Sequence, residues 1–406
     1  MEEKLLRNYA RLIAQLGGHV VKGDEVWIEA ELDQPEFIYM LVEECYKCGA
    51  KNVDVRWSYD QLARLHYRYM TLGNLSKLSP IALARFKYFA KKLPTRIYII
   101  SEDPDGLKGV NQMKMAKSRA KIYPKIKKYR NAADGKYKWC IAGVPGKAWA
   151  KKVFPDLPEE EAIEKLWEAI LTTSRVDGND PVENWNKHNN FLVQKREQLK
   201  KLDLRKLYYK SSNGTDFEVD LIPGISWGAG IEEAPNKGPF NPNIPSEEVF
   251  TSPIAGRCEG TLVASKPLSY NGELIEDFSI TFKNGKVSEV RARKNQKLLE
   301  HMVNMDEGAS MLGEVALVPY TSPINQSGIL FFNTLYDENA ACHVALGAGF
   351  KELLDVNLST EEAKAKGIND SMIHVDFMVG TKDLDIVGVD AKGQKHQIFK
   401  DGEWAF

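Results

Sequence analysis

Side chains that can bind a metal ion interrupt apolar segments in the second half of the sequence. Within residues 373–379, His374 and Asp376 are two positions apart. On a strand this spacing points both side chains to one face, while Val375 and Phe377 point to the other. Burying such a polar pair is costly without a partner, and a metal ion is a suitable partner. A hydrogen-bonded His–Asp pair explains this segment equally well by itself.

Acidic residues elsewhere in this half follow the same logic. Glu314 interrupts residues 313–318, which otherwise read as a buried strand. Glu247 and Glu248 form an acidic pair directly after a proline-rich loop. Taken singly, each of these carboxylates is more often a surface or capping residue.

One more pair combines a carboxylate with an imidazole. Glu338 and His343 flank the start of a helix that we expect near residues 339–348, whose small side chains allow close packing. Together the segments supply four carboxylates and two imidazoles. That mixture suits two divalent ions such as zinc, cobalt or manganese, with one carboxylate bridging them.

Two such ions, about 3.5–4 Å apart, activate a water molecule and polarise a carbonyl oxygen. Amide hydrolysis at neutral pH needs both effects, because water is a poor nucleophile and the oxyanion needs stabilising charge. The residues by themselves leave peptidase, amidase and phosphoesterase open.

Other familiar motifs in the chain are incomplete. Residues 143–148 have two residues between their glycines where a P-loop has four, and Ala148 stands where Ser or Thr would bind magnesium. Cys45 and Cys48 have redox spacing but lie at the C-terminal end of an expected helix, where the dipole disfavours a thiolate. No Gly-x-Ser-x-Gly elbow occurs.

The elements that position these residues change character near residue 204. Before it, expected helices separate strands that we predict at residues 25–30, 52–57, 96–101 and 136–142, which indicates a parallel βαβ sheet covered on both faces. After it, strands and turns are closely spaced, and Asn284-Gly285 predicts a hairpin. We therefore predict an α/β protein with an N-terminal parallel-sheet βαβ domain (residues 1–203) and a C-terminal mixed α+β catalytic, metal-binding domain (residues 204–406).

Composition indicates a soluble globular protein. The chain has 406 residues, of which 43% are hydrophobic and 27% charged. Its apolar runs are too short to span a bilayer, and no secretory signal precedes residue 20. Five cysteines are neither dense nor even in number, which argues against a disulfide framework. We predict a cytoplasmic protein without a membrane partner.

Charge is unevenly distributed. The formal net charge is −1, but residues 114–130 carry eight basic side chains and no acid. A basic helix of this kind can bind phosphate backbones. A solvated helix face or a subunit contact is favoured here, because few aromatic residues are placed to stack on bases. We predict no nucleic-acid partner.

Four blocks in the same order resemble the M29 metallopeptidases, the thermophilic-type aminopeptidases that include aminopeptidases T, S and II. The blocks are residues 243–251, 312–318, 333–343 and 373–380. This resemblance implies a homodimer that removes N-terminal residues from peptides and uses two divalent ions, of zinc, cobalt or magnesium. By position it places the metal ligands at Glu248, Glu314, Glu338, His343, His374 and Asp376, with Glu314 as the bridging ligand.

One position departs from the family pattern. Phe350 stands where the family has a tyrosine, and a phenyl ring cannot donate a hydrogen bond to an oxyanion. Loss of one such donor costs on the order of 10²–10³ in rate. Tyr320 and Tyr336 are candidate substitutes, and Glu247 is a candidate proton shuttle. Phe350 also motivates an alternative function, a catalytically weakened metal-bound dimer of the same fold that acts as a binding or scaffold protein.

Overall fold

The computed structural model describes residues 1–270, 272–354 and 357–406. Its contacts divide the chain into two compact units, one of residues 1–186 with 231–244 and the other of residues 187–230 with 245–406. Residues 231–244 therefore return to the first unit after the chain has entered the second. The boundary after residue 203 stays a prediction about where independently folding domains meet.

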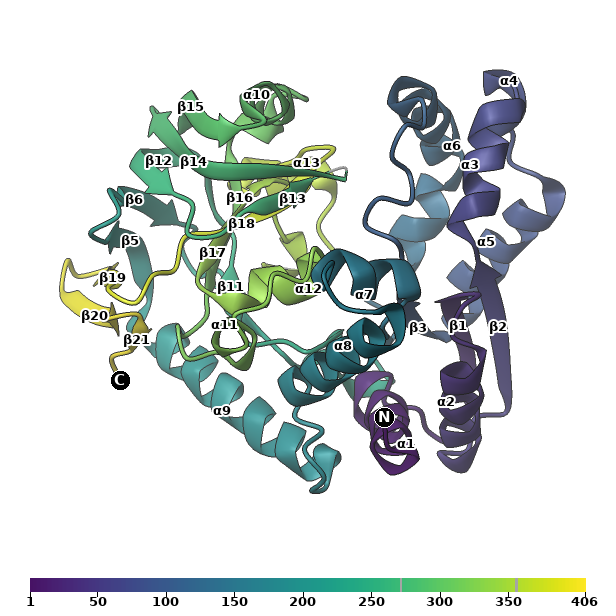
Figure 1. Cartoon of the computed structure of the whole chain (residues 1–406). Helices are drawn as coiled ribbons and strands as arrows, with labels where there is room; N and C mark the ends of the chain where they lie inside the picture. Colours follow the sequence, from purple (N-terminus) through teal and green to yellow (C-terminus); the bar gives the residue numbers. More distant parts are fainter. Residues whose placement is uncertain (271, 355–356) are drawn as a thin grey trace. The chain divides into compact units, whose positions relative to one another are not determined.

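The first unit contains a parallel sheet in the order β10-β4-β3-β1-β2. This confirms the predicted parallel βαβ arrangement, and Figure 1 shows β1, β2 and β3 in this unit. The segment that returns from the second unit forms a short hairpin, β8 with β9, and then adds β10 beside β4. The strands are β1 (Glu25–Glu31), β2 (Asn52–Ser58), β3 (Thr95–Ile100), β4 (Trp139–Gly143), β8 (Glu232–Ala234), β9 (Gly238–Phe240) and β10 (Asn243–Ile244).

Helices cover both faces of this sheet. On one face Trp27 of β1 packs against Phe89, while Ile28 next to it points to the other face. Tyr9 contacts Phe37 in a separate aromatic cluster and donates a hydrogen bond to the carbonyl at the end of β4. The helices are α1 (Glu3–Leu12), α2 (Pro35–Lys47), α3 (Asp60–Tyr69), α4 (Leu72–Leu75), α5 (Pro80–Lys92), α6 (Gln112–Ala133), α7 (Lys147–Val153), α8 (Glu159–Thr173) and α9 (Pro181–Leu202), the last of which continues into the second unit.

The second unit contains a large antiparallel sheet in the order β13-β14-β12-β6-β5-β19-β20-β21, with β15 beside β14. The predicted hairpin joins β14 to β15, and both Asn284 and Gly285 have positive φ, as a two-residue turn of this kind requires. A side chain at 285 would collide with the backbone of Gly256. The strands are β5 (Leu204–Lys210), β6 (Asp216–Leu221), β12 (Pro253–Val263), β13 (Leu268–Tyr270), β14 (Glu273–Lys283), β15 (Lys286–Lys294), β19 (Asp385–Asp390), β20 (Lys395–Lys400) and β21 (Glu403–Trp404).

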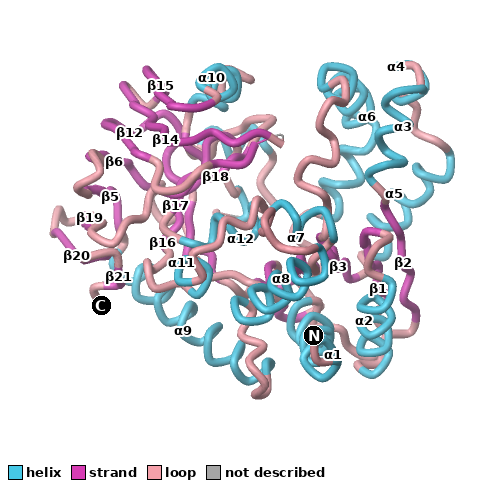
Figure 2. Tube along the Cα trace, viewed as in Figure 1, coloured by secondary structure: helices cyan, strands magenta, loops and turns pink. Residues whose placement is uncertain are grey.

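A second antiparallel sheet of this unit has the order β18-β17-β16-β11-β7. Figure 2 shows β16, β17 and β18 of this sheet. The strands are β7 (Gly228–Ala229), β11 (Val249–Thr251), β16 (Leu312–Leu317), β17 (His343–Gly347) and β18 (His374–Met378). The helical elements of the unit are α10 (Gln296–Val303), α11 (Pro323–Gln326), α12 (Thr334–Asp337), α13 (Thr360–Ala365) and the 3₁₀ turns Gly308–Ser310, Glu338–Ala340 and Lys351–Leu353.

The helix expected near residues 339–348 is wrong. A 3₁₀ turn ends at Ala340, and the chain then extends into β17, which is buried along its whole length. The strand pairs with β16 on one side and β18 on the other, so both backbone edges are satisfied by neighbours. Its small residues reflect close packing within a sheet, because tertiary contacts outweigh local propensity here.

One hydrophobic core serves both sheets of the second unit. Val315, Val344 and Phe377, from adjacent strands of the smaller sheet, join it together with Phe278 and Phe282 of the larger one. Since each of these strands buries one face in this core, their alternate residues share the opposite face. Within the described ranges, no helix is long and apolar enough to cross a membrane.

Candidate metal centre

Four of the six predicted metal ligands, Glu314, His343, His374 and Asp376, project from the face of the smaller sheet that lies opposite the core. Strand register aligns Glu314 of β16 with Ala345 of β17, and Ala345 with Asp376 of β18. Residues directly opposite each other in antiparallel strands share a face. Two carboxylates therefore flank an alanine whose short side chain leaves the space between them open.

Both histidines lie on that same face. His343 opens β17 opposite Ala316, and His374 opens β18 opposite Gly347. Alanine and glycine at these register positions leave room for the imidazole rings. Large core residues on one face thus alternate with ligands, Ala345 and Gly347 on the other, and Phe250 and Met378 border the ligands on that face.

The ligand atoms converge at short distances. His343 Nε2 lies 3.2 Å from Glu248 Oε2, next to the start of β11. His374 Nε2 lies 3.1 Å from Glu314 Oε2 and 3.3 Å from Asp376 Oδ1. Glu248 and Asp376, which are 128 positions apart in the sequence (376 − 248), therefore belong to one cluster.

Backbone carbonyls fix the orientation of the imidazole rings. His343 Nδ1 lies 3.2 Å from the carbonyl oxygen of Ala341, and His374 Nδ1 lies 2.8 Å from that of Ala348. A protonated Nδ1 donates to the carbonyl in each case, which leaves Nε2 directed at the carboxylates. A hydrogen bond from the other ring nitrogen to a carbonyl is what orients histidine ligands in metal sites.

The buried carboxylates of the cluster need positive charge nearby to balance them. Burial raises the pKa of Glu314 to about 7, against the hydrogen bond from His374 that lowers it. Burial would lower the pKa of His343, but Glu248, Glu314 and Asp376 outweigh it and raise that pKa to about 10. Burial alone would raise the pKa of Asp376, yet the charge of His374 brings it below its usual range. Without a cation, protons must balance the buried carboxylates.

These residues fit divalent metal ions. Glu248, Glu314 and His343 bring their ligand atoms within 4.8 Å of one another, and so do Glu314, His374 and Asp376. Asp376 Oδ1 is buried and accepts no hydrogen bond among the described residues, which suits an atom with a lone pair reserved for an ion. Mixed carboxylate and imidazole donors are the ligands that zinc, cobalt and manganese accept.

Glu338 borders the cluster without joining either ligand group. Burial, followed by the charges of Asp376 and Glu248, raises its pKa well above the usual range. Its side chain is less buried than that of Glu314, and Asn339 Nδ2 lies 3.5 Å from its Oε1. The structure therefore places Glu338 at the edge of the site, and its role as a metal ligand stays a prediction.

Glu247 has surroundings different from those of Glu248. Its carboxylate lies 3.7 Å from His188 Nε2, and that nitrogen lies 2.8 Å from the carbonyl oxygen of Ser246. Its backbone N–H donates to Asn339 Oδ1 at 2.7 Å. The role of Glu247 as a proton shuttle stays a prediction.

Asn339 and His188 are structural partners of the site that the sequence did not single out. Asn339 ties the segment of Glu247 and Glu248 to the turn that carries Glu338, and it is fully buried. Both sit in unremarkable sequence contexts, so no motif or spacing identifies them. Only the fold reveals that they hold ligand-bearing segments together.

The aromatic candidates differ in location. The Phe350 ring lies 5.1 Å from the His374 ring, so the position of the family tyrosine borders the cluster. Tyr336 is fully buried and stacks on Phe331 at 4.7 Å. The backbone N–H of Tyr320 donates to the carbonyl of Gly402, and its own carbonyl accepts a hydrogen bond from Asn325 Nδ2. The catalytic roles of both tyrosines stay predictions.

Comparisons with known proteins find relatives that match along the whole chain. Residues 2–404 match the family described as Thermophilic metalloprotease (M29). Aminopeptidase 2 of Geobacillus stearothermophilus is 38% identical over 408 residues, which covers 100% of this chain and 98% of the relative. Aminopeptidase T of Thermus thermophilus is 35% identical over 403 residues, with 98% of each chain covered.

Two solved structures superpose on nearly the whole chain. Wild-type AmpT from Thermus thermophilus superposes with a TM-score of 0.90 at 34% identity and covers 100% of both chains. A 2,5-dihydroxypyridine dioxygenase from Pseudomonas putida has a TM-score of 0.51 at 11% identity, over 98% of this chain and 96% of that one. The second likeness concerns the fold alone.

Proposed function

Because this chain belongs to the M29 family of metallopeptidases, which its match over residues 2–404 shows, we propose that it is an aminopeptidase that uses two divalent ions. It removes residues from the N-terminus of peptides, as the names of its relatives indicate for those proteins. The observation that carries the proposal is the sharing of Glu314 between the two ligand groups.

The shared carboxylate supports a site for two ions. Glu314 has one oxygen 3.1 Å from His374, and it is also grouped with Glu248 and His343. A carboxylate in that position can bridge neighbouring ions. We propose Glu248 and His343 for one ion, and His374 and Asp376 for the other.

When bound, the ions supply positive charge that activates water and polarises the scissile carbonyl. The residues of the chain position that chemistry. The carbonyls of Ala341 and Ala348 hold both imidazoles in place, and the apolar face of the sheet keeps the strand register fixed. Rigid ligand placement of this kind is what makes electrostatic stabilisation effective.

Proton transfer requires a carboxylate that is not committed as a ligand. Glu338 stands at the edge of the cluster, outside both ligand groups and more exposed than Glu314. As an alternative to the ligand role that the family resemblance implies for Glu338, we propose that it holds the proton of the attacking water and passes it to the leaving amine. Glu247 faces His188 instead and supports the loop that carries Glu248.

Elemental analysis combined with turnover tests the proposal. We expect about two divalent ions per chain and cleavage of leucine or arginine anilides after loading with zinc, cobalt or magnesium. Bound metal without turnover of any aminoacyl anilide or peptide would instead support a binding or scaffold protein. One ion per chain with full activity would exclude the two-ion site.

The proposal extends to the assembly and its compartment. We propose a homodimer, as the family resemblance implies, which light scattering on the purified protein will test. All five cysteines are free, which suits a reducing compartment such as the cytoplasm.

A further inference from the structure

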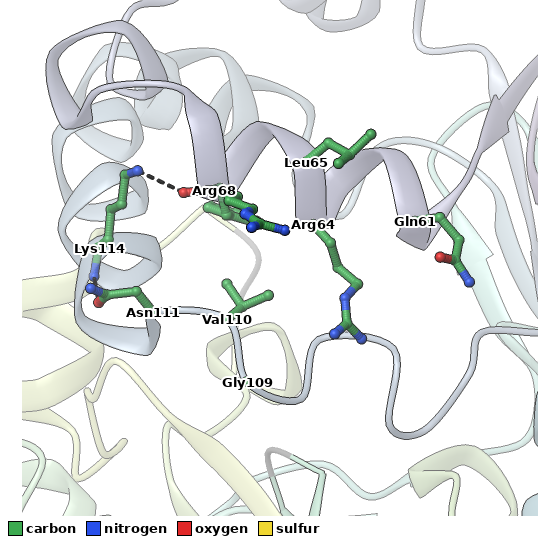
Figure 3. A pocket seen from close by; sticks show the side chains of 9 residues that line it. Gln61, Arg64, Leu65, Arg68, Gly109, Val110, Asn111 and Lys114 are labelled. Carbon is green, nitrogen blue, oxygen red and sulfur yellow. Dashed lines mark hydrogen bonds between the residues drawn. The ribbon is translucent and has the colours of Figure 1, made fainter.

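A cavity in the first unit lies apart in the sequence from every residue of the metal centre. It has a volume of about 540 Å³ and lies between α3 and the segment that leads into α6 (Figure 3). Its lining is formed by Gln61, Arg64, Leu65, Tyr67, Arg68, Gly109, Val110, Asn111 and Lys114. We call it the α3–α6 cavity.

The polar lining of this cavity consists of cations and neutral groups. Arg64, Arg68 and Lys114 contribute positive charge, and no carboxylate is among the lining residues. Arg64 and Arg68 are one helical turn apart on α3, so they share a face of that helix. Figure 3 shows Arg64 extending from α3 toward the segment of Gly109 and Val110.

Neutral carbonyls hold two of these cations in place. Arg64 Nη1 donates to the carbonyl of Gly106 at 3.1 Å, and Lys114 Nζ donates to that of Tyr67 at 2.6 Å. Across the described ranges of the chain, none of the three cations has a carboxylate oxygen within 4 Å. Carbonyls therefore orient Arg64 and Lys114 without contributing a negative charge.

Acidic groups in the neighbourhood are partly engaged elsewhere. Asp105 pairs with Lys152 at 2.9 Å. Burial, followed by the charge of Asp103, raises the pKa of Asp60, while Arg64 acts in the opposite direction. Arg64 therefore interacts electrostatically with Asp60 but does not form an ion pair with it.

The N-terminus of α6 carries a side-chain cap. Asn111 Oδ1 accepts the backbone N–H of Lys114 at 2.9 Å, which caps the helix. The attraction of the cavity for an anion therefore rests on its side-chain cations. It also gives a role to the first residue of the basic stretch 114–130, which the metal centre does not use.

We propose that the α3–α6 cavity binds a small multivalent oxyanion, of the phosphate-ester or polycarboxylate class. Two guanidinium groups and an ammonium group can each donate to such an anion, and planar guanidinium matches both phosphate and carboxylate oxygens. Leu65 and Val110 add apolar atoms to the lining, and these atoms can contact a short carbon skeleton beside the charged groups. This site is independent of the proposed peptidase chemistry.

Calorimetric titration of the full-length protein with inorganic pyrophosphate and, separately, with citrate tests the proposal. We expect saturable binding of at least one of them, and the tighter of the two identifies the phosphate or the carboxylate class. The double variant R64Q/R68Q should bind roughly a hundredfold more weakly, at about tenfold for each charged hydrogen-bonding group removed. Its turnover of aminoacyl anilides should stay unchanged.

The matched control is R119Q/K121Q, which removes the same charge from exposed positions of α6 outside the cavity. Equal weakening in both double variants would overturn the proposal, because it would show attraction to diffuse charge. Absence of binding for both anions at millimolar concentration would also overturn it. So would a single-stranded oligonucleotide that binds more tightly than either small anion.

A second variant keeps the test valid if the double variant folds poorly. Gln61→Glu places a carboxylate in the lining while leaving all three cations present. An acidic side chain in the first turn of α3 suits the helix dipole, so folding should not suffer. We expect at least tenfold weaker anion binding, and unchanged affinity would contradict the site.

Discussion

The metal centre and the α3–α6 cavity present opposite electrostatic problems. In the centre, Glu248, Glu314 and Asp376 are buried together, so their charge must be balanced by protons or metal ions. In the cavity, Arg64 and Arg68 are exposed, so water already solvates them. Burial therefore requires the centre to take up metal ions or protons, whereas a ligand of the cavity would neutralise charges that water already solvates.

Among the variants considered, replacing the proposed bridging carboxylate should cause the largest loss of turnover at the metal centre. Glu314→Ala removes the residue common to both ligand groups, so we expect turnover to fall by at least roughly 10³ and metal content to drop. Steady-state kinetics with an aminoacyl anilide and elemental analysis measure both. Glu273→Ala, at an exposed position of the same unit, is the control and should change neither. Full activity in Glu314→Ala would exclude the assigned centre.

Removing the metal should separate the two sites thermodynamically. We expect dialysis against a strong chelator to abolish turnover and to lower the stability of the protein by about 4 kcal/mol relative to metal at a thousand times its Kd. Thermal melting with and without added zinc, cobalt or magnesium measures the change. Binding of pyrophosphate or citrate to the α3–α6 cavity should survive chelation, and its loss would mean that the anion binds at the metal centre.

Removing the side chain of Asn339, which holds the segment of Glu247 and Glu248, should have an intermediate effect on stability and metal affinity. Asn339→Ala leaves the buried N–H of Glu247 without its acceptor, which should cost about 1–3 kcal/mol of stability. Groups that hold the ligand-bearing segments in place also set the metal affinity. We therefore expect the Kd for the metal to rise by roughly tenfold to a hundredfold. Chemical denaturation and competition with a metal indicator report the two quantities. Asn304→Ala, on the surface of the same unit, should leave both unchanged.

Restoring the hydroxyl group that Phe350 lacks should raise the turnover rate of the metal centre. The ring of Phe350 lies against His374, so Phe350→Tyr places a donor beside the ligands. We expect kcat to rise by roughly tenfold to a hundredfold with little change in KM, since the donor acts on the oxyanion. Phe350→Leu should give no gain. An unchanged kcat in Phe350→Tyr would mean that another group already stabilises the oxyanion.

Two kinds of pattern in the sequence proved reliable. The helix-separated strands of the first part predicted a parallel sheet, and Asn284-Gly285 predicted the β14–β15 hairpin. Both patterns are local, because hydrophobic period and turn residues act within a few positions. The helix expected near residues 339–348 failed for the converse reason, since β17 is stabilised by its two neighbouring strands.

The sequence by itself determined the chemical identity of the candidate ligands and the family. His374 and Asp376 share a strand face by spacing alone, and Glu314 is conspicuous within an apolar strand. Only the tertiary structure decided that Ala345 separates Glu314 from Asp376, that Glu247 faces His188, and that three cations line one cavity. The reason is that register and packing join residues far apart in the chain, and no local pattern encodes those distances.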